Sequence, residues 1–426
     1  MGGDWQSPIV VKKSRCTASD ASHGTSSDTR SQPITRIRKR PASATVQRKP
    51  SGSTLDVADQ QSADCTATPI MVGSKLGRHG GALRVASDCS GWCSELWALK
   101  GLDVKVEHVF CSEIDRPATR LMKWLWGVKH VYPDLTIRDN TTIATGIDLY
   151  CAGFPCQPFS RSGIMKGTRD DRGHIFFHIA DFLGSNKPEA FVLENVASLV
   201  TDFSETFTAM VSMISDIKDA RGHAKTYTVF WKILHANEHG LPQHRERVFI
   251  IGLKTKSIMQ PFRWPTPTRM RSLKSIFDLG PAAYEPDPPT LNPTNLKNLM
   301  AIMEQYKATP SKLAQTENVA NVGGSTAHIM MNMCPCLTKQ RSASRAYYSI
   351  SRRRSLTLAD MSRLQGVAAK DIEGWESVVS GPQLGGIIGN AIPICVMERV
   401  IRAVLTSLGH PVGPDRWLSA AEVPLV

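Results

Sequence analysis

Long apolar runs are absent from this sequence of 426 residues. No stretch approaches the roughly 18 consecutive apolar residues of a membrane-spanning helix, and the N-terminus has no apolar signal core. Cysteines spaced as zinc ligands are also missing, because neither Cys89 with Cys93 nor Cys334 with Cys336 has a second pair at zinc-ribbon spacing. We therefore expect a soluble, unsecreted protein with free thiols, no metal site and no membrane partner.

Aromatic residues are nearly absent from residues 1–78, which are rich in Ser, Thr, Ala, Asp and Arg. Such a segment cannot bury enough apolar surface to offset its chain entropy, so we predict a disordered, basic N-terminal tail. The cluster Arg36-Ile-Arg-Lys-Arg-Pro41 fits a nuclear-import signal or a nucleic-acid tether, and equally a solvated charge run. The expected location is the nucleus in a eukaryote and the cytoplasm otherwise.

The composition as a whole, 41% hydrophobic and 21% charged, is that of a globular protein with a sizeable core. The formal net charge of +13 suggests an acidic partner, of which nucleic acid is the commonest.

Short apolar strands alternate with helical patterns after the tail, which predicts an α/β sheet. We predict strands at 83–87, 106–111, 147–151, 190–193, 226–234 and 248–251, and helices at 174–184, 203–219 and 294–307. Further helices are expected to run through Leu99, from Asp115 to Trp126, over 356–366, and after Pro393 through Leu405.

A small-residue turn, Asp88-Cys-Ser-Gly-Trp-Cys-Ser94, follows the first strand and precedes a helix. This order is the usual cradle for a nucleotide-like cofactor, although Gly91 alone permits a close backbone approach. Glu113 follows the second strand, where a carboxylate would bind a ribose diol. Asp139, which precedes the 147–151 strand, would accept from an adenine amino group or would simply be a turn aspartate.

Cys156 stands just beyond a strand that stops at Gly153, between Pro155 and Pro158. Its position predicts a thiol at the carboxyl edge of the sheet, where chemistry collects; the alternative is a small buried apolar residue. The basic, glycine-containing loop 161–173 is either a lid over a phosphate-bearing ligand or an exposed surface loop.

Glu194 follows another buried strand, and a carboxylate there beside a cysteine predicts a reactive pair. Arg245 and Arg247 are two residues apart, so in an extended segment they would point to the same side. Two such guanidiniums usually bind phosphate or carbonyl oxygens, and a salt-bridged edge is the alternative.

Four motifs in this order, Gly153-Phe-Pro-Cys-Gln-Pro-Phe-Ser160, Glu194-Asn-Val196, Gln243-His-Arg-Glu-Arg247 and Gly389-Asn-Ala-Ile-Pro393, resemble those of the cytosine-C5 methyltransferases. The resemblance spans roughly residues 83–405. It departs from the family in the first motif, where Cys89-Ser-Gly-Trp-Cys93 keeps one glycine and has Cys93 in place of the second.

The resemblance implies a Rossmann-like class I methyltransferase sheet with helices on both faces and a small irregular target-recognition domain. It also implies a DNA (cytosine-5-)-methyltransferase that takes its methyl group from S-adenosylmethionine and acts on a flipped cytosine. In that mechanism the thiolate of Cys156 adds to C6 and Glu194 protonates N3, while Arg247 holds the base carbonyl with Arg245 nearby. The cofactor contacts implied by motif are Cys89, Ser90, Gly91, Glu113, Ile114, Asp139, Pro155 and Asn390.

The domain organisation that we expect follows from the same motifs and from the composition. Residues 79–253 form the first part of the catalytic domain, 254–345 the target-recognition domain, 346–410 the returning catalytic part, and 411–426 a C-terminal tail. The segments 336–345 and 351–355 supply phosphate-binding capacity or a solvated basic face. DNA is the expected partner of a monomer.

Two other functions stay open from the sequence. The tRNA-cytosine branch of the family is one, since Cys336-Leu-Thr338 echoes its Cys-Phe-Thr motif with Leu in place of Phe. A catalytically inactive nucleic-acid-binding homologue is the other, although Cys156, Glu194 and Arg247 are all present.

Overall fold

The computed structural model describes residues 81–143, 145–155, 175–279, 291–306, 316–324 and 327–418. The predicted tail with its basic cluster, Cys156 itself and the predicted lid 161–173 lie outside the described residues. Within the described residues no single helix is long and apolar enough to cross a membrane, although two consecutive helices, Gly381–Asn390 and Ile394–Ser407, bent by 44°, together meet that criterion by length and composition.

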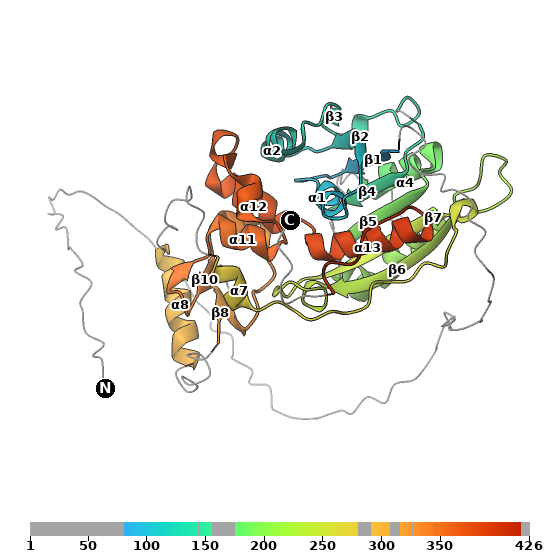
Figure 1. Cartoon of the computed structure of the whole chain (residues 1–426). Coiled ribbons are helices and arrows are strands. Elements are labelled where there is room, and N and C mark those ends of the chain that lie inside the picture. The colour runs from blue at the N-terminus through green and yellow to red at the C-terminus, as the bar shows by residue number, and fades with distance from the viewer. Residues whose placement is uncertain are drawn as a thin grey trace, which may run out of the picture. The chain divides into compact units, whose positions relative to one another are not determined.

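A mixed sheet of seven strands forms the centre of the described residues, in the order β3-β2-β1-β4-β5-β7-β6 (Figure 1). The strands are β1 Leu83–Asp88, β2 Val106–Ser112, β3 Val131–Tyr132, β4 Leu149–Gly153, β5 Ala190–Val196, β6 Tyr227–His235 and β7 Glu246–Lys254. β1 to β5 are parallel where they pair, and β7 runs antiparallel between β5 and β6. The predicted Rossmann-like sheet is confirmed.

Helices cover both faces of this sheet (Figure 1). The helices of the larger part are α1 Ser94–Gly101, α2 Arg116–Trp126, α4 Ile175–Asn186, α5 Ser198–Thr201, α6 Ser204–Ser215, α11 Leu358–Leu364, α12 Gly381–Asn390 and α13 Ile394–Ser407. Short 3-10 turns lie at Leu135–Ile137, Ala236–Glu238, Thr255–Ser257, Ala369–Ile372 and Trp375–Ser377.

The two faces of the sheet have separate apolar cores. On one face, α1 and α13 pack on alternate residues of the strands, such as Leu83 and Val85. On the other face, α4 and α6 pack on residues such as Ala86 and Tyr150. Because both faces are covered, the strands are apolar almost throughout, which is why the sequence shows continuous apolar runs at these places.

Several predicted boundaries differ from the structure, among them those of β4, β5 and α6. β4 runs from Leu149 to Gly153, two residues later than predicted, and β5 continues through Glu194 and Asn195 to Val196, because β7 pairs with it along its whole length. Helix α6 ends at Ser215, four residues before the predicted end. The chain then forms a turn in which Asp219 accepts from the backbone N–H of Arg221 and His223.

A smaller antiparallel sheet, in the order β11-β10-β8-β9, is formed by β8 Asn318–Asn321, β9 His328–Met331, β10 Tyr347–Ser349 and β11 Arg354–Ser355. Helices α7 Leu273–Phe277, α8 Pro293–Tyr306 and α10 Lys339–Ala343 belong to the same region. Ile302 of α8 packs against Val322 and Ile329. The predicted domain boundary at 345 divides this sheet, because β10 and β11 pair with strands that precede it.

The last described residues do not form the tail that we predicted for 411–426. Trp417 is only 1% exposed and belongs to the same core as α1 and α13. Two ion pairs, Arg399 with Asp415 at 2.7 Å and Arg416 with Glu398, join this segment to α13. Burial of the Trp417 ring and of these charges fixes the segment through residue 418.

Candidate active site

The carboxyl ends of β1, β2, β4 and β5 meet at one edge of the large sheet, beside a cavity of about 460 Å³. Strand ends of a parallel sheet carry loops with freely varied side chains, so this edge is where an α/β protein builds its site. Segments from α1, α12 and the loop before α13 complete the wall of the cavity.

A left-handed turn follows β1 at one end of the cavity. Cys89, Gly91 and Cys93 have φ angles of 52°, 57° and 60°, which favour glycine. Cys93 thus adopts a left-handed conformation that favours glycine, and its buried side chain packs in the core with α13.

Glu113 is fixed in this end of the cavity by two backbone groups. The N–H of Gly91 donates to one carboxylate oxygen at 2.7 Å and that of Asp115 to the other at 2.8 Å. Burial raises the pKa of Glu113, and the two N–H donors counteract that rise. Each oxygen keeps a further lone pair, so the carboxylate can still accept from a hydroxyl group. Asp115 caps α2 as predicted, accepting from Ala118 N–H at 3.3 Å.

Seven of the eight predicted cofactor contacts line the cavity. They are Cys89, Ser90, Gly91, Glu113, Ile114, Pro155 and Asn390. Asp139 does not: it is exposed, and its carboxylate accepts from the backbone N–H and the hydroxyl of Thr141 at 2.9 and 2.7 Å. These contacts are those of a turn aspartate, and the assignment of Asp139 to the cofactor stays a prediction.

Glu194 and Arg247 form an ion pair, and both of them line the cavity. Arg247 Nε is 3.0 Å from Glu194 Oε1, and Arg247 Nη1 donates to the carbonyl of Glu246. Glu194 is 7% exposed, and its Oε1 has no aligned hydrogen bond, so the contact is an ion pair alone. The carboxylate therefore retains capacity for a ligand.

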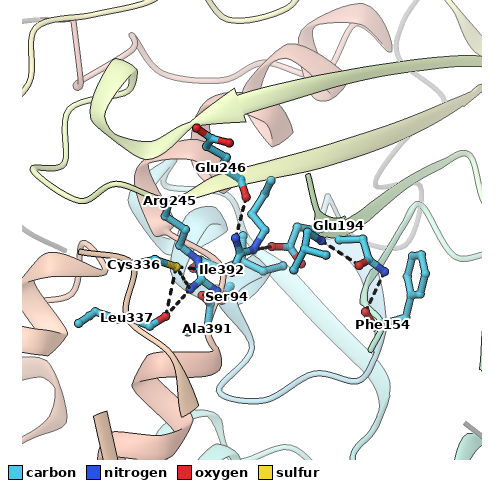
Figure 2. Close-up of polar contacts among 12 residues, drawn as sticks. Ser94, Phe154, Glu194, Arg245, Glu246, Cys336, Leu337, Ala391 and Ile392 are labelled. Atoms are coloured by element: carbon cyan, nitrogen blue, oxygen red, sulfur yellow. Dashed lines mark hydrogen bonds and ion pairs between the residues drawn. The ribbon is translucent and has the colours of Figure 1, made fainter. Parts of the chain in front are cut away.

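Arg245 has other neighbours, although it also reaches the cavity wall (Figure 2). Its Nη1 donates to the carbonyl of Leu337 and its Nη2 to that of Ala391, both at 2.7 Å. It is 4% exposed, and burial, followed by the nearby Arg247, lowers its pKa. The structure favours a structural role for Arg245 over the predicted catalytic one, since both terminal nitrogens bind backbone carbonyls.

The strand that leads to Cys156 is held beside Glu194. Gly153 is the register partner of Glu194 across β4 and β5. The amide of Asn195 donates to the carbonyl of Phe154 at 3.1 Å, and Phe154 and Pro155 line the cavity. Cys156 is the next residue of the chain and lies outside the described residues, so its pairing with Glu194 stays a prediction.

A buried ion pair that the sequence did not indicate lies at the base of the cavity. Arg138 donates to both oxygens of Asp88, at 2.5 and 2.7 Å, and Tyr150 donates to one of them at 2.7 Å. Arg138 also donates to Ser112, which joins the ends of β1 and β2. The position of Asp88 at the end of a predicted strand could have indicated a functional carboxylate. The sequence could not identify Arg138 as its partner, because that pairing depends on the tertiary fold.

The predicted phosphate-binding segments are largely engaged within the protein. Arg352 contacts Asp278 at 2.5 Å and Glu317 at 2.7 Å, and Arg354 contacts Asp360 at 2.5 Å. Lys339 contacts Asp115 at 2.6 Å and lines the cavity. These ion pairs occupy three of the basic side chains of the segments 336–345 and 351–355, whose phosphate-binding capacity stays a prediction.

Comparison with known proteins agrees with this geometry. The model of the C-5 cytosine-specific DNA methylase family matches residues 97–406. The type II methyltransferase M.NgoBI of Neisseria gonorrhoeae is 31% identical over 297 residues, 68% of this chain and 84% of that protein. M.HaeII of Haemophilus aegyptius is 30% identical over 308 residues, 71% and 87% of the two chains.

The solved structures agree at the level of the fold. A protein encoded within an Escherichia coli prophage superposes with a TM-score of 0.54 at 17% identity, over 77% of this chain and all of that one. The two sequence relatives are bacterial, so the nuclear location stays a prediction. From the family match, the two relatives and the site at the sheet edge, we conclude that the chain belongs to the C-5 cytosine-specific DNA methylases, which transfer the methyl group of S-adenosylmethionine to cytosine.

Proposed function

We propose that this protein methylates C5 of cytosine in DNA through a transient covalent bond between the sulfur of Cys156 and C6 of the base. The observation that carries the proposal is the pairing of Gly153 with Glu194, which lines the cavity beside Arg247. Cys156 is three residues beyond Gly153, and three residues of chain reach at most about 11 Å. The thiol is thereby tethered near the carboxylate.

The chemistry that these side chains perform starts from the low nucleophilicity of C5. The thiolate of Cys156 adds to C6 while the carboxyl group of Glu194 gives a proton to N3, so the ring becomes an enamine that is nucleophilic at C5. Arg247 holds Glu194 in place and offers N–H donors to the base carbonyl. After methylation, loss of the C5 proton expels the thiolate and restores the aromatic ring.

The residues of the cavity fit S-adenosylmethionine, which when bound supplies the electrophilic methyl group. Glu113 keeps lone pairs for a ribose diol, and the turn at Gly91 lets the backbone approach a ligand. Ile114, 77% exposed, offers an apolar surface for a purine ring. The cavity extends from these residues to Glu194, so one continuous space serves the cofactor and the base.

A methyl-transfer assay with DNA and tRNA as alternative acceptors tests the proposed function. We expect radiolabelled methyl groups from S-adenosylmethionine to appear in DNA with the wild-type protein and not with Cys156→Ala. Labelling of tRNA in place of DNA would favour the tRNA branch. Binding of DNA without transfer to either acceptor would identify an inactive binding homologue.

A further inference from the structure

The cavity wall contains another buried carboxyl group, that of Glu95, which the proposed chemistry does not use. Glu95 lies in the first turn of α1 and lines the cavity, yet it is only 3% exposed. Its Oε1 has no hydrogen-bond partner among the described residues. Burial of a carboxylate oxygen without a hydrogen-bond partner costs free energy. A ligand bound in the cavity could offset that cost if it brought a complementary charge.

Among the residues that the structure describes, no cation contributes to the electrostatics of Glu95. Polar contacts with Ser87 and Cys93 favour the charged form of the carboxyl group and lower its pKa, but less than burial raises it. The other ionisable groups near it, Cys111 and Cys151 on the adjacent strands, are neutral thiols whose pKa values burial raises. Arg138, the buried guanidinium described above, is bound to both oxygens of Asp88.

The consequence of this burial is a carboxyl group that titrates near neutrality. Desolvation raises the pKa of Glu95 to about 7, and the hydrogen bond from Ser87 only partly opposes this. A positive charge brought into the cavity would stabilise the carboxylate form, whereas a neutral ligand of the same shape would not.

Substrate and product of methyl transfer differ by such a charge. S-adenosylmethionine carries a sulfonium cation; when its methyl group bonds to C5, the sulfur keeps the electron pair of the broken bond and becomes a neutral thioether. We propose that Glu95 is a cofactor-specificity residue whose carboxylate stabilises the positive charge of bound S-adenosylmethionine and so favours it over S-adenosylhomocysteine. This inference rests on the proposed function above.

The role has a mechanistic consequence. Because the stabilisation disappears when the sulfur loses its charge, the product is held less tightly than the substrate and leaves more readily. The residue acts on the cofactor alone, and no bond to Glu95 forms or breaks.

Isothermal titration calorimetry of the full chain with each compound tests this inference without using activity. We expect Glu95→Gln to weaken S-adenosylmethionine binding by about tenfold, the effect of one unit of differential pKa, and to change S-adenosylhomocysteine binding by less than about twofold. Glu107→Gln is the matched control, since Glu107 is an exposed acid on β2 outside the cavity wall. It should leave both affinities unchanged.

A second measurement uses the wild-type protein, so it does not depend on the folding of a variant. Titrations at pH 7 in buffers of different ionisation enthalpy should show that S-adenosylmethionine binding releases part of a proton and that S-adenosylhomocysteine binding releases less. Cys93, Cys111 and Cys151 remain protonated at this pH, which leaves Glu95 and Glu113 as the groups of the wall with raised carboxyl pKa values. The difference should vanish in Glu95→Gln.

Equal weakening of both compounds by Glu95→Gln, no weakening of either, or equal proton release would overturn the inference. A wild-type protein that binds neither compound would overturn it together with the cofactor assignment. The protein could also prefer S-adenosylmethionine in a way that depends on Glu95 and yet transfer no methyl group to DNA. That result would support the inference and contradict only the proposed function.

Discussion

Two arginines separated by a single residue have different surroundings at this site and, we expect, different tasks. Arg247 faces Glu194 and keeps donors for a ligand, whereas the terminal nitrogens of Arg245 bind the carbonyls of Leu337 and Ala391. Both carbonyls belong to segments that follow Arg245 by at least about ninety residues in the chain. A motif read from sequence treats the two residues alike, and only their partners separate them.

Lysine substitution should separate the two roles. Arg247→Lys should lower kcat by about 10²-fold, the usual effect of losing one donor to developing charge, with little change in stability. Arg245→Lys should instead cost about 3 kcal/mol of unfolding free energy, because buried carbonyls lose their charged donors. Steady-state kinetics and urea denaturation of both variants measure this; an unstable Arg247→Lys beside a stable Arg245→Lys would reverse the assignment.

The burial of Glu95 predicts how the free energy of unfolding depends on pH. Its pKa, raised to about 7, means that the folded state binds more protons than the unfolded state between about pH 4.5 and 7. Stability contributed by this group is therefore present at low pH and falls as pH rises through that window, by about 3 kcal/mol in all. Denaturation midpoints between pH 5 and 8 should fall less in Glu95→Gln than in wild type; identical slopes would show that the carboxyl group is not buried in this way.

At the scale of elements, glycines on one helix decide how the smaller region joins the larger. Gly385 and Gly389 of α12 are four residues apart and face α10. A Cβ at Gly389 would come within 2.6 Å of Ser342 Oγ and would also collide with the carbonyl of Thr338; one at Gly385 would lie 2.6 Å from the carbonyl of Ser342. The two helices are this close because α12 has no side chains there.

Alanine substitution tests that packing. Gly389→Ala should destabilise the protein by about 1–3 kcal/mol through overpacking. Gly184→Ala in α4 is the matched control, since a Cβ there meets nothing within 4 Å; it should be neutral or stabilise by roughly 0.5–1 kcal/mol. Thermal or urea unfolding of the pair gives the comparison, and equal effects would rule out close helix packing as the cause.

The sequence predicted well those helices and strands whose boundaries are set by neighbouring residues in the chain. The apolar run before Asp88 and the Asp115 cap before Pro117 fixed β1 and the start of α2. The sequence did not predict that Arg138, and not Asp139, points inward, because the ion pair with Asp88 joins residues fifty positions apart. The smaller sheet was missed for the same reason: its strands are short, and β10 pairs with a strand that precedes it by more than twenty residues.

At the scale of the whole molecule, the C-terminal segment 411–418 packs against the apolar core. Trp417 packs on Gly240 and belongs to the core of α1 and α13, and its carbonyl accepts from the hydroxyl of Thr268 at 3.0 Å. The segment thus connects the helix layer with the chain that leaves the large sheet. Its sequence is short and proline-containing, so no periodicity indicated that it packs.

Removal of the buried ring should unfold the protein more easily. We expect Trp417→Ala to cost about 3–5 kcal/mol, as for other buried aromatic residues, and Leu418→Ala, 57% exposed, to change stability by less than about 0.5 kcal/mol. Urea unfolding followed by circular dichroism measures both. A Trp417→Ala protein as stable as wild type would show that the segment is a tail after all.

The covalent step is tested most directly with duplex DNA that carries 5-fluorocytosine. Fluorine at C5 cannot leave as a proton, so the bond between sulfur and C6 persists after methyl transfer. In the presence of S-adenosylmethionine, the wild-type protein should form a complex with this DNA that survives denaturing electrophoresis, and Cys156→Ala should form none. A wild-type protein that methylates ordinary DNA without trapping the fluorinated base, or a trapped complex that persists in Cys156→Ala, would contradict the account.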